Sequence, residues 1–373
     1  MAPDTDSQPS SAEVLQGTPF GEQNRRRLIT QYFGEKGAPD ATRAWERVYG
    51  MLLWVDSTTG LAHCYESDKC QPGRTWYARS LAFHQWLASA LHSTPLDIGK
   101  QLDWLFQKAL EDYLKARAEK QQKQKDKGAQ QRAVYAGQSF PMPGADPEIE
   151  RIIGEALKPF LTAQPPVEIF DAVADSLREY WKQENKRKNL LGEGFEDVLA
   201  ATVNAACGGG ITARTRISIA DVAGFHALGA KDKATKVDLV IENPKWPRPA
   251  LVNVKWSIRA DREDQLWDDF KEYVRFDRDQ RGFDHYLVTN EFDPARLNAV
   301  CDRREANHFI FKHVVHINTD GVLAAYGPPP AAQTETQSAK PPRDSSMERI
   351  RQQVQQGRLI GLSKWLTAFG ANG

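Results

Sequence analysis

The second half of the chain alternates apolar and polar residues in a way that predicts an α/β core. Segments in which apolar and polar residues alternate, and short runs of apolar residues, predict strands. Apolar residues spaced three and four positions apart predict helices. Three consecutive glycines, 208–210, are expected to end the first of these helices. Because helices and strands take turns, we expect a mixed central sheet flanked by helices. The expected strands are 212–219, 237–242, 250–255, 284–289 and 313–317, and the expected helices are 192–207, 263–276 and 294–304.

Residues 21–132 predict an N-terminal, mostly helical domain. Its last helix is marked by apolar residues on one face, which are Leu102, Leu105, Phe106, Ala109, Leu110 and Tyr113. The polar run 116–132 then loses this stripe and is expected to be a solvated helix end or a flexible basic segment, with contact to a DNA backbone as the alternative. The mixture of Arg74, Trp76 and Arg79 fits either a nucleic-acid surface beside the core target or a tryptophan-rich core with surface arginines.

Composition shifts set the other expected boundaries. Residues 1–20 are polar and predict a disordered tail, and the Pro/Gly-rich stretches 133–148 and 327–345 predict linkers. A domain is expected over 149–326, and an amphipathic C-terminal helix over 346–373.

Charge and composition narrow the function classes. The 373 residues carry 49 Lys+Arg and 49 Asp+Glu, so a formal net charge of zero excludes a uniformly basic nucleic-acid coat. Any nucleic-acid site must therefore be a local concentration of charge. The sequence shows no signal peptide and no apolar stretch of about 20 residues, which predicts a soluble, cytoplasmic protein with no membrane partner.

The four cysteines, Cys64, Cys70, Cys207 and Cys301, form no Cys-x-x-Cys pair. Reduced thiols are expected rather than a disulfide framework. His63 lies next to Cys64, but a second pair of zinc ligands is missing, so we expect no zinc site there.

The chemically informative segment is 236–264. Asp238 lies in one expected strand, and Lys255 ends the next strand, 17 residues later. Two strands joined by a turn bring such residues together at one end of a sheet. A carboxylate beside a lysine suits metal-assisted hydrolysis of a phosphodiester, because the carboxylate can hold Mg²⁺ and the lysine can act on the attacking water. Alone, the pair is more typical of a surface ion pair at the end of a sheet.

The run from Lys255 onward, KWSIRADR, resembles the combined catalytic and recognition motif of the CCGG-type restriction endonucleases, a branch of the PD-(D/E)XK nucleases. The resemblance covers about residues 190–320. It implies a restriction-endonuclease-like core in which Lys255 is catalytic. It also implies that Arg259 and Arg262 donate to guanine O6 and N7, and that Asp261 accepts from cytosine N4. These are the pairings expected in the major groove, each worth about 1–3 kcal/mol of discrimination.

The acidic residues depart in part from this pattern. The usual acid two positions before the lysine is Asn253, which cannot supply charge to a metal. The resemblance implies that a carboxylate from the following helix replaces it, and the family spacing falls on Asp269, with Asp268 and Glu272 as rivals. It also implies a supporting glutamate from an earlier helix, for which the candidates are Glu196 and, second, Glu193. All of these acids could instead be solvated helix residues.

The resemblance as a whole implies a type II restriction endonuclease that uses Mg²⁺, held by Asp238 and Asp269. Its partner would be double-stranded DNA with a palindromic, C·G-rich core of the CCGG or interrupted CC-GG type. A symmetric target implies a homodimer, with a tetramer left open, and a restriction system implies a companion DNA methyltransferase. Two alternatives stay open: a repair or mobile-element nuclease that only grips phosphates, and a non-catalytic DNA-binding protein with a degenerate nuclease core.

Overall fold

The structure is a computed structural model that describes residues 18–56, 59–62, 72–133, 155, 167–227, 229, 234–258, 263–328 and 345–371. Several sequence predictions concern residues outside these ranges. They are the N-terminal tail up to residue 17, the His63, Cys64 and Cys70 group, most of both linkers, and the recognition residues Arg259, Asp261 and Arg262.

The chain divides into two compact units. One comprises residues 1–21 and 109–190, and the other comprises residues 22–108 and 191–373. This division differs from the limits expected from the sequence, because 22–108 group with the sheet-containing part of the chain. In the first unit, the Lys186 ammonium lies 3.6 Å from the ring centre of Tyr113 and 5.4 Å from that of Phe20.

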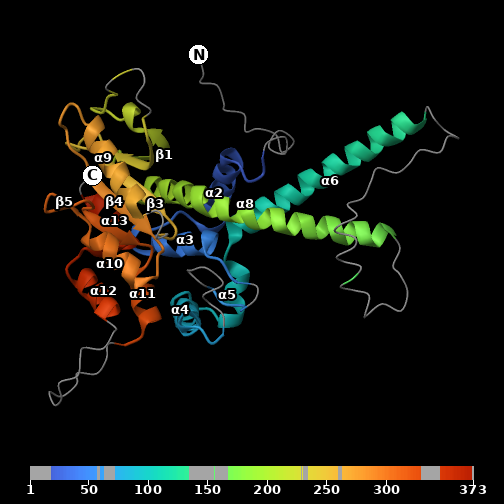
Figure 1. Cartoon of the computed structure of the whole chain (residues 1–373), viewed down its shortest axis with the longest axis horizontal. Coiled ribbons are helices and arrows are strands. Elements are labelled where there is room, and N and C mark those ends of the chain that lie inside the picture. The colour runs from blue at the N-terminus through green and yellow to red at the C-terminus, as the bar shows by residue number, and fades with distance from the viewer. Residues whose placement is uncertain are drawn as a thin grey trace. The chain divides into compact units, whose positions relative to one another are not determined.

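The second unit contains a mixed six-stranded sheet in the order β1-β2-β3-β4-β7-β8. Figure 1 labels β1, β3 and β4 of this sheet. The pairs β1–β2 and β2–β3 are antiparallel, whereas β3, β4, β7 and β8 run parallel to one another. The expected α/β class with a mixed sheet is therefore confirmed. The strands are β1 (Thr212–Ser218), β2 (Lys236–Glu242), β3 (Ala250–Lys255), β4 (Asp284–Thr289), β7 (His313–His316) and β8 (Leu359–Gly361), with β5 (Arg304–Glu305) and β6 (His308–Phe309) forming a separate hairpin.

Helices cover both faces of this sheet. Successive residues of a strand point to opposite faces, and in β4 the ring of His285 stacks on Phe270 of α9 (Glu263–Phe276), with 5.5 Å between ring centres. The next residue, Tyr286, contacts Trp365 and Phe369 of α13 (Leu362–Ala371) instead. The sheet is thus the middle layer between α9 on one face and α13 on the other.

The remaining helices follow from their apolar spacing and end signals. In the long α8, Phe195, Val198, Leu199 and Val203 are buried on one face, and the helix ends before Gly208–Gly210, all with positive φ, as the sequence predicts. These helices are α2 (Glu22–Lys36), α3 (Ala44–Leu52), α4 (Thr75–Ala90), α5 (Pro95–Gln101), α6 (Trp104–Ala133), α8 (Val167–Ala206), α10 (Pro294–Asp302), α11 (Thr319–Tyr326) and α12 (Ser345–Gln355), with 3₁₀ turns at Ala41–Arg43 and Ile219–Asp221.

The prediction of a single C-terminal helix is wrong. The segment forms α12, then β8, then α13, and β8 pairs in parallel with β7. Gly357 explains the break, because its φ of 70° lies in the left-handed region that ends a helix. Apolar residues at Leu359 and Ile360 then add a strand to the sheet. Similarly, the helix expected over 294–304 ends at Asp302, and Arg304 begins β5.

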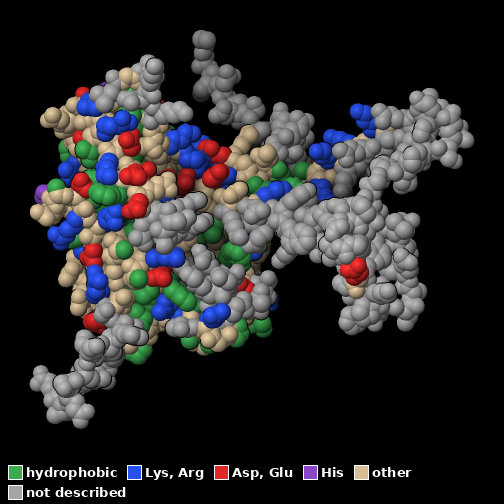
Figure 2. Space-filling view, viewed as in Figure 1, with side chains coloured by type: hydrophobic (Ala, Val, Ile, Leu, Met, Phe, Trp, Pro, Cys, Tyr) green, Lys and Arg blue, Asp and Glu red, His purple; other side chains and the backbone are tan. Residues whose placement is uncertain are grey.

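The surface carries charges of both signs. Figure 2 shows lysine and arginine side chains interspersed with aspartate and glutamate over the visible face, in keeping with the net charge of zero. Within the described residues, no helix combines the length and apolar character needed to cross a membrane.

Candidate active site at the ends of strands β2 and β3

Asp238 and Lys255 lie together where β2 and β3 separate. The Lys255 ammonium donates to the Asp238 carboxylate at 2.7 Å, and the backbone N–H of Val254 donates to the same oxygen at 2.8 Å. Regular pairing of these strands stops at Leu239 and Val252. The Asp238 carboxylate therefore accepts from the Val254 N–H, which would bond to a backbone carbonyl if the two strands paired further. This hydrogen bond fixes the carboxylate at the open end of the sheet.

The neighbouring strand is distorted at the same place. Arg216 lies inside β1 with a φ of 54°, and the β1–β2 register omits the pairing of Arg216 with Asp238. A positive φ in a strand costs free energy for a residue with a Cβ, and such strain persists only where other contacts enforce it. Here the contacts are carboxylates: the Arg216 guanidinium donates to Glu196 at 2.8 Å and to Asp197 at 2.5 Å.

Asp269, in α9, is the helix acid directed at the site. Its carboxylate accepts from the Asn253 amide at 3.0 Å. The rival acids turn elsewhere: Asp268 is exposed and pairs with Lys271, and Glu272 pairs with Arg275. The structure therefore brings Asp238, Lys255 and Asp269 to one corner.

Asn253 also links this corner to a buried histidine. Its Oδ1 lies 2.8 Å from His285 Nε2, and the other ring nitrogen lies 3.0 Å from the carbonyl oxygen of Ile310. Burial lowers the pKa of His285 to about 3, so its ring is neutral at pH 7. Which ring nitrogen of His285 carries the proton therefore decides whether Asn253 accepts or donates across this contact.

Glu196 approaches the same corner from α8. The preceding residue, Phe195, packs edge-on against Trp256 at 5.0 Å between ring centres, which holds α8 beside the end of β3. Glu193, the second candidate, is largely exposed and pairs with Arg25 at 2.8 Å. Glu196 is therefore the glutamate that the structure places near Asp238 and Lys255.

Two carboxyl groups in the corner hold their protons unusually well. Burial, together with the charge of Asp238, raises the pKa of Glu196 to about 7 against the opposing effect of Arg216 and Lys255. Burial also raises the pKa of Asp269 to about 6, an effect that Lys255 opposes and Asp238 strengthens. Three acids thus surround one lysine, and the excess negative charge is relieved by protonation when no other cation is bound.

The donor set suits a cation that keeps some of its water. Within the described ranges, no three His, Cys, Asp or Glu side chains form a ready-made metal cage. Mg²⁺ does not require one, because it is usually held by one or two carboxylates together with waters and substrate phosphates. Asp238 and Asp269 are the two carboxylates that could hold it.

A buried glutamate that the sequence analysis missed anchors the chain just before the recognition residues. Glu291 has no exposed surface and accepts from the backbone N–H of Ile258 at 2.7 Å. Its other oxygen accepts from Phe292 at 2.9 Å and Asp293 at 2.7 Å. Burial raises its pKa to about 7. The sequence signal was an acid two residues after the end of an apolar strand.

The N-terminal candidates Arg74, Trp76 and Arg79 are not all available as a surface. The Arg79 guanidinium lies over Trp76, 4.1 Å from the ring centre, and 5.0 Å from that of Tyr326. This favours the interpretation that Arg79 and Trp76 pack against the body of the fold, whereas Arg74 is exposed.

No protein-family model matches the chain, and a search of curated proteins found no match.

Proposed function

We propose that the protein is a type II restriction endonuclease with a PD-(D/E)XK-type core. The observation that carries the proposal is the Asp238–Lys255 contact at the diverging ends of two strands, with Asp269 of the next helix beside it. This arrangement agrees with the motif Lys255–Arg262, in which recognition residues follow the lysine directly.

Each residue has a role that its geometry supports. Lys255 is held by Asp238 and can orient or deprotonate the attacking water, or neutralise charge on the phosphate. Glu196, with its pKa near 7, can take a proton at neutral pH. Asn253 holds Asp269 in place without adding a fourth charge.

Asp238 and Asp269 would hold Mg²⁺, which supplies polarisation of the phosphate and activation of a water.

For target recognition, we propose that Arg259, Asp261 and Arg262 read C·G pairs in the major groove. The anchoring of Ile258 by Glu291 supports this, since it fixes the chain immediately before those residues. A palindromic target with a CCGG or interrupted CC-GG core requires two equivalent readers, so we propose a homodimer acting on double-stranded DNA, with a companion methyltransferase protecting the host's own sites.

The test is digestion of unmethylated plasmid with the full chain and Mg²⁺, followed by mapping of the cut ends. We expect discrete fragments with ends at C·G-rich palindromes. Lys255→Ala and Asp238→Ala should abolish cutting but leave sequence-specific binding, measured in Ca²⁺, within about tenfold. Arg259→Ala should remove specific binding itself.

Matched controls make the test decisive. Lys271→Ala and Asp268→Ala alter an exposed ion pair on α9 and should cut normally. Cutting without sequence preference would replace this proposal with that of a non-specific nuclease. Specific binding with no cutting under any divalent cation would indicate a DNA-binding protein instead. Normal cutting by Lys255→Ala would refute the catalytic assignment.

A further inference from the structure

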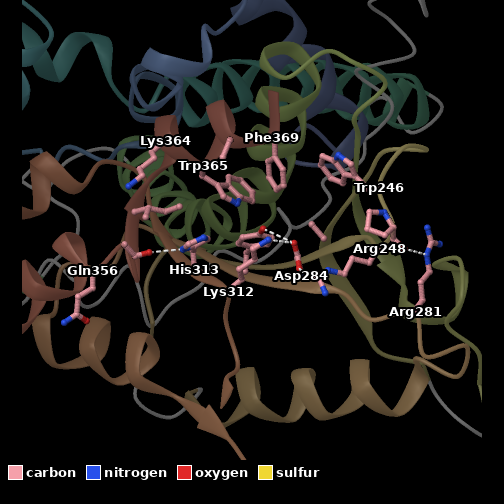
Figure 3. A pocket seen from close by; sticks show the side chains of 16 residues that line it. Trp246, Arg248, Arg281, Asp284, Lys312, His313, Gln356, Lys364, Trp365 and Phe369 are labelled. Atoms are coloured by element: carbon pink, nitrogen blue, oxygen red, sulfur yellow. Dashed lines mark hydrogen bonds and ion pairs between the residues drawn. The ribbon is translucent and has the colours of Figure 1, made fainter. Parts of the chain in front are cut away.

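A cavity of about 650 Å³ lies at the other end of the sheet from Lys255. It is lined by the first residues of β3, β4 and β7 and by α13, and Figure 3 shows it from close by. β3 begins at this cavity with Ala250 and ends at Lys255, about 16 Å away at about 3.3 Å per residue. The two places also lie on opposite faces, since Tyr286 and α13 line the cavity whereas Asn253 and α9 belong to the other face.

The cavity is strongly cationic. Four basic side chains line it, and Asp284 is the only acid among its lining residues. Asp284 holds two of them, Arg248 at 2.6 Å and Lys312 at 2.6 Å, so these two cations share a single counter-charge. Arg281 donates to the backbone carbonyls of Pro247 and Ala223 rather than to an acid. Lys364 is exposed and has no acidic partner within the described residues. An anion is the ligand that this surplus of positive charge favours.

One wall of the cavity is aromatic. Trp246 stacks on Phe369, with 5.2 Å between ring centres, and Trp365 and Tyr286 continue the wall. Trp365 is only 2% exposed, and its indole nitrogen has no hydrogen-bond partner in the described part of the chain. Figure 3 shows this nitrogen on the side of the ring that faces the middle of the cavity. A buried N–H without an acceptor costs free energy, which a ligand oxygen or nitrogen would recover.

These properties together define the ligand chemistry. Cavities of about 300–1,000 Å³ bind small molecules, the aromatic wall suits a planar ring, the cations suit a phosphate, and the indole N–H suits a ring acceptor. We propose that this cavity binds a nucleoside phosphate, at a site separate from the Asp238–Lys255 corner. The nucleotide can be free or part of a nucleic-acid strand, and both share this chemistry.

Isothermal titration of the full chain with nucleoside monophosphates tests the proposal, with inorganic phosphate and an uncharged nucleoside as partial ligands. We expect saturable binding of at least one nucleoside monophosphate, at least tenfold tighter than either partial ligand. Lys364→Gln should weaken nucleotide binding at least threefold and leave the nucleoside unaffected. Trp365→Phe, which removes the N–H and keeps an aromatic ring, should weaken both. Lys100→Gln, an exposed lysine of α5, is the control and should change nothing.

Asp238→Asn should bind the nucleotide with unchanged affinity, which separates this site from the nuclease proposal. Loss of nucleotide binding in Asp238→Asn would refute a separate site. Competition by a short single-stranded oligonucleotide supports a nucleic-acid source, and its absence supports a free nucleotide. The proposal is overturned if no nucleoside monophosphate binds up to 10 mM, or if Lys364→Gln and Trp365→Phe bind as the unaltered chain does.

Discussion

Asn253 joins the buried His285 to the acidic corner of the site, with 2.8 Å between Asn253 Oδ1 and His285 Nε2. Both residues are at most 3% exposed, and their backbones belong to the neighbouring parallel strands β3 and β4. The Asn253 amide thus contacts the imidazole of His285 at one end and the carboxylate of Asp269 at the other.

This relationship predicts a coupling that a double-mutant cycle can measure. Asn253→Leu removes both hydrogen bonds and leaves buried polar groups unpaired, so unfolding free energy should fall by about 2 kcal/mol. His285→Phe should pack among Phe270 and Phe311 but remove the partner of Asn253 Oδ1. The double variant should cost less than the sum of the single variants by at least about 1 kcal/mol. Urea denaturation followed by circular dichroism gives all four values, and additive effects would contradict the coupling.

Arg216 should matter far more than its neighbour Arg214. Arg216→Ala removes the partner of Glu196 and one partner of the buried Asp197, so we expect a loss of about 3 kcal/mol in unfolding free energy. Without this guanidinium, the pKa of Glu196 should also rise above about 7, since Arg216 lowers it more than Lys255 does. Carboxyl NMR of labelled glutamate measures this shift.

Arg214→Ala is the matched control. It lies in the same strand, and its pair with Glu242 is largely solvent-exposed, so its loss should cost at most about 1 kcal/mol. Equal losses in the two variants would show that Arg216 is an ordinary surface residue.

Glu291 should make the protein less stable as pH rises. Its pKa is about 7 in the folded chain against an ordinary value of 4.5, so the folded state binds its proton more tightly than the unfolded state does. This contribution is fully present below pH 4.5 and is lost as pH rises through about 7, a change of up to about 3 kcal/mol. Glu291→Gln, which cannot ionise, should lack it.

Denaturation of both proteins between pH 4.5 and 8 checks this sign, because the buried histidines His285 and His316 contribute equally to each. Stability of Glu291→Gln relative to the unaltered chain should therefore increase with pH. A constant difference would mean that Glu291 titrates normally.

Gly357 should resist substitution where Gly192 does not. Gly357 has a φ of 70°, so Gly357→Ala should cost about 1–2 kcal/mol of unfolding free energy although open space surrounds it. Gly192 lies in α8, also with open space around it, and Gly192→Ala should stabilise the chain by about 0.5–1 kcal/mol. Thermal denaturation distinguishes the two, and a neutral Gly357→Ala would undo the explanation for the helix break.

Local patterns predicted much of the central sheet and part of the site. Strands 237–242, 250–255 and 284–289 stand where their apolar runs placed them, because burial on both faces leaves a clear apolar signal. The proximity of Asp238 and Lys255 followed from one short connection between adjacent antiparallel strands.

What the sequence could not predict depends on contacts between distant segments. The segment Leu359–Gly361 is too short to identify as a strand from its sequence. It pairs with β7 only because the preceding helix ends at Gly357, and a glycine at that position also fits a continuous helical pattern. The contact of Asn253 with His285 spans 32 residues, and that of Glu291 with Ile258 spans 33. Neither leaves a periodic pattern along the chain.

The six strands lie side by side in the same order in which they occur along the chain. Each strand is therefore synthesised after the strand that it pairs with. The sheet can grow from one edge during synthesis, and no strand has to insert between two others. The Asp238–Lys255 contact is complete within the first three strands, and each later strand covers the edge that its predecessor exposes.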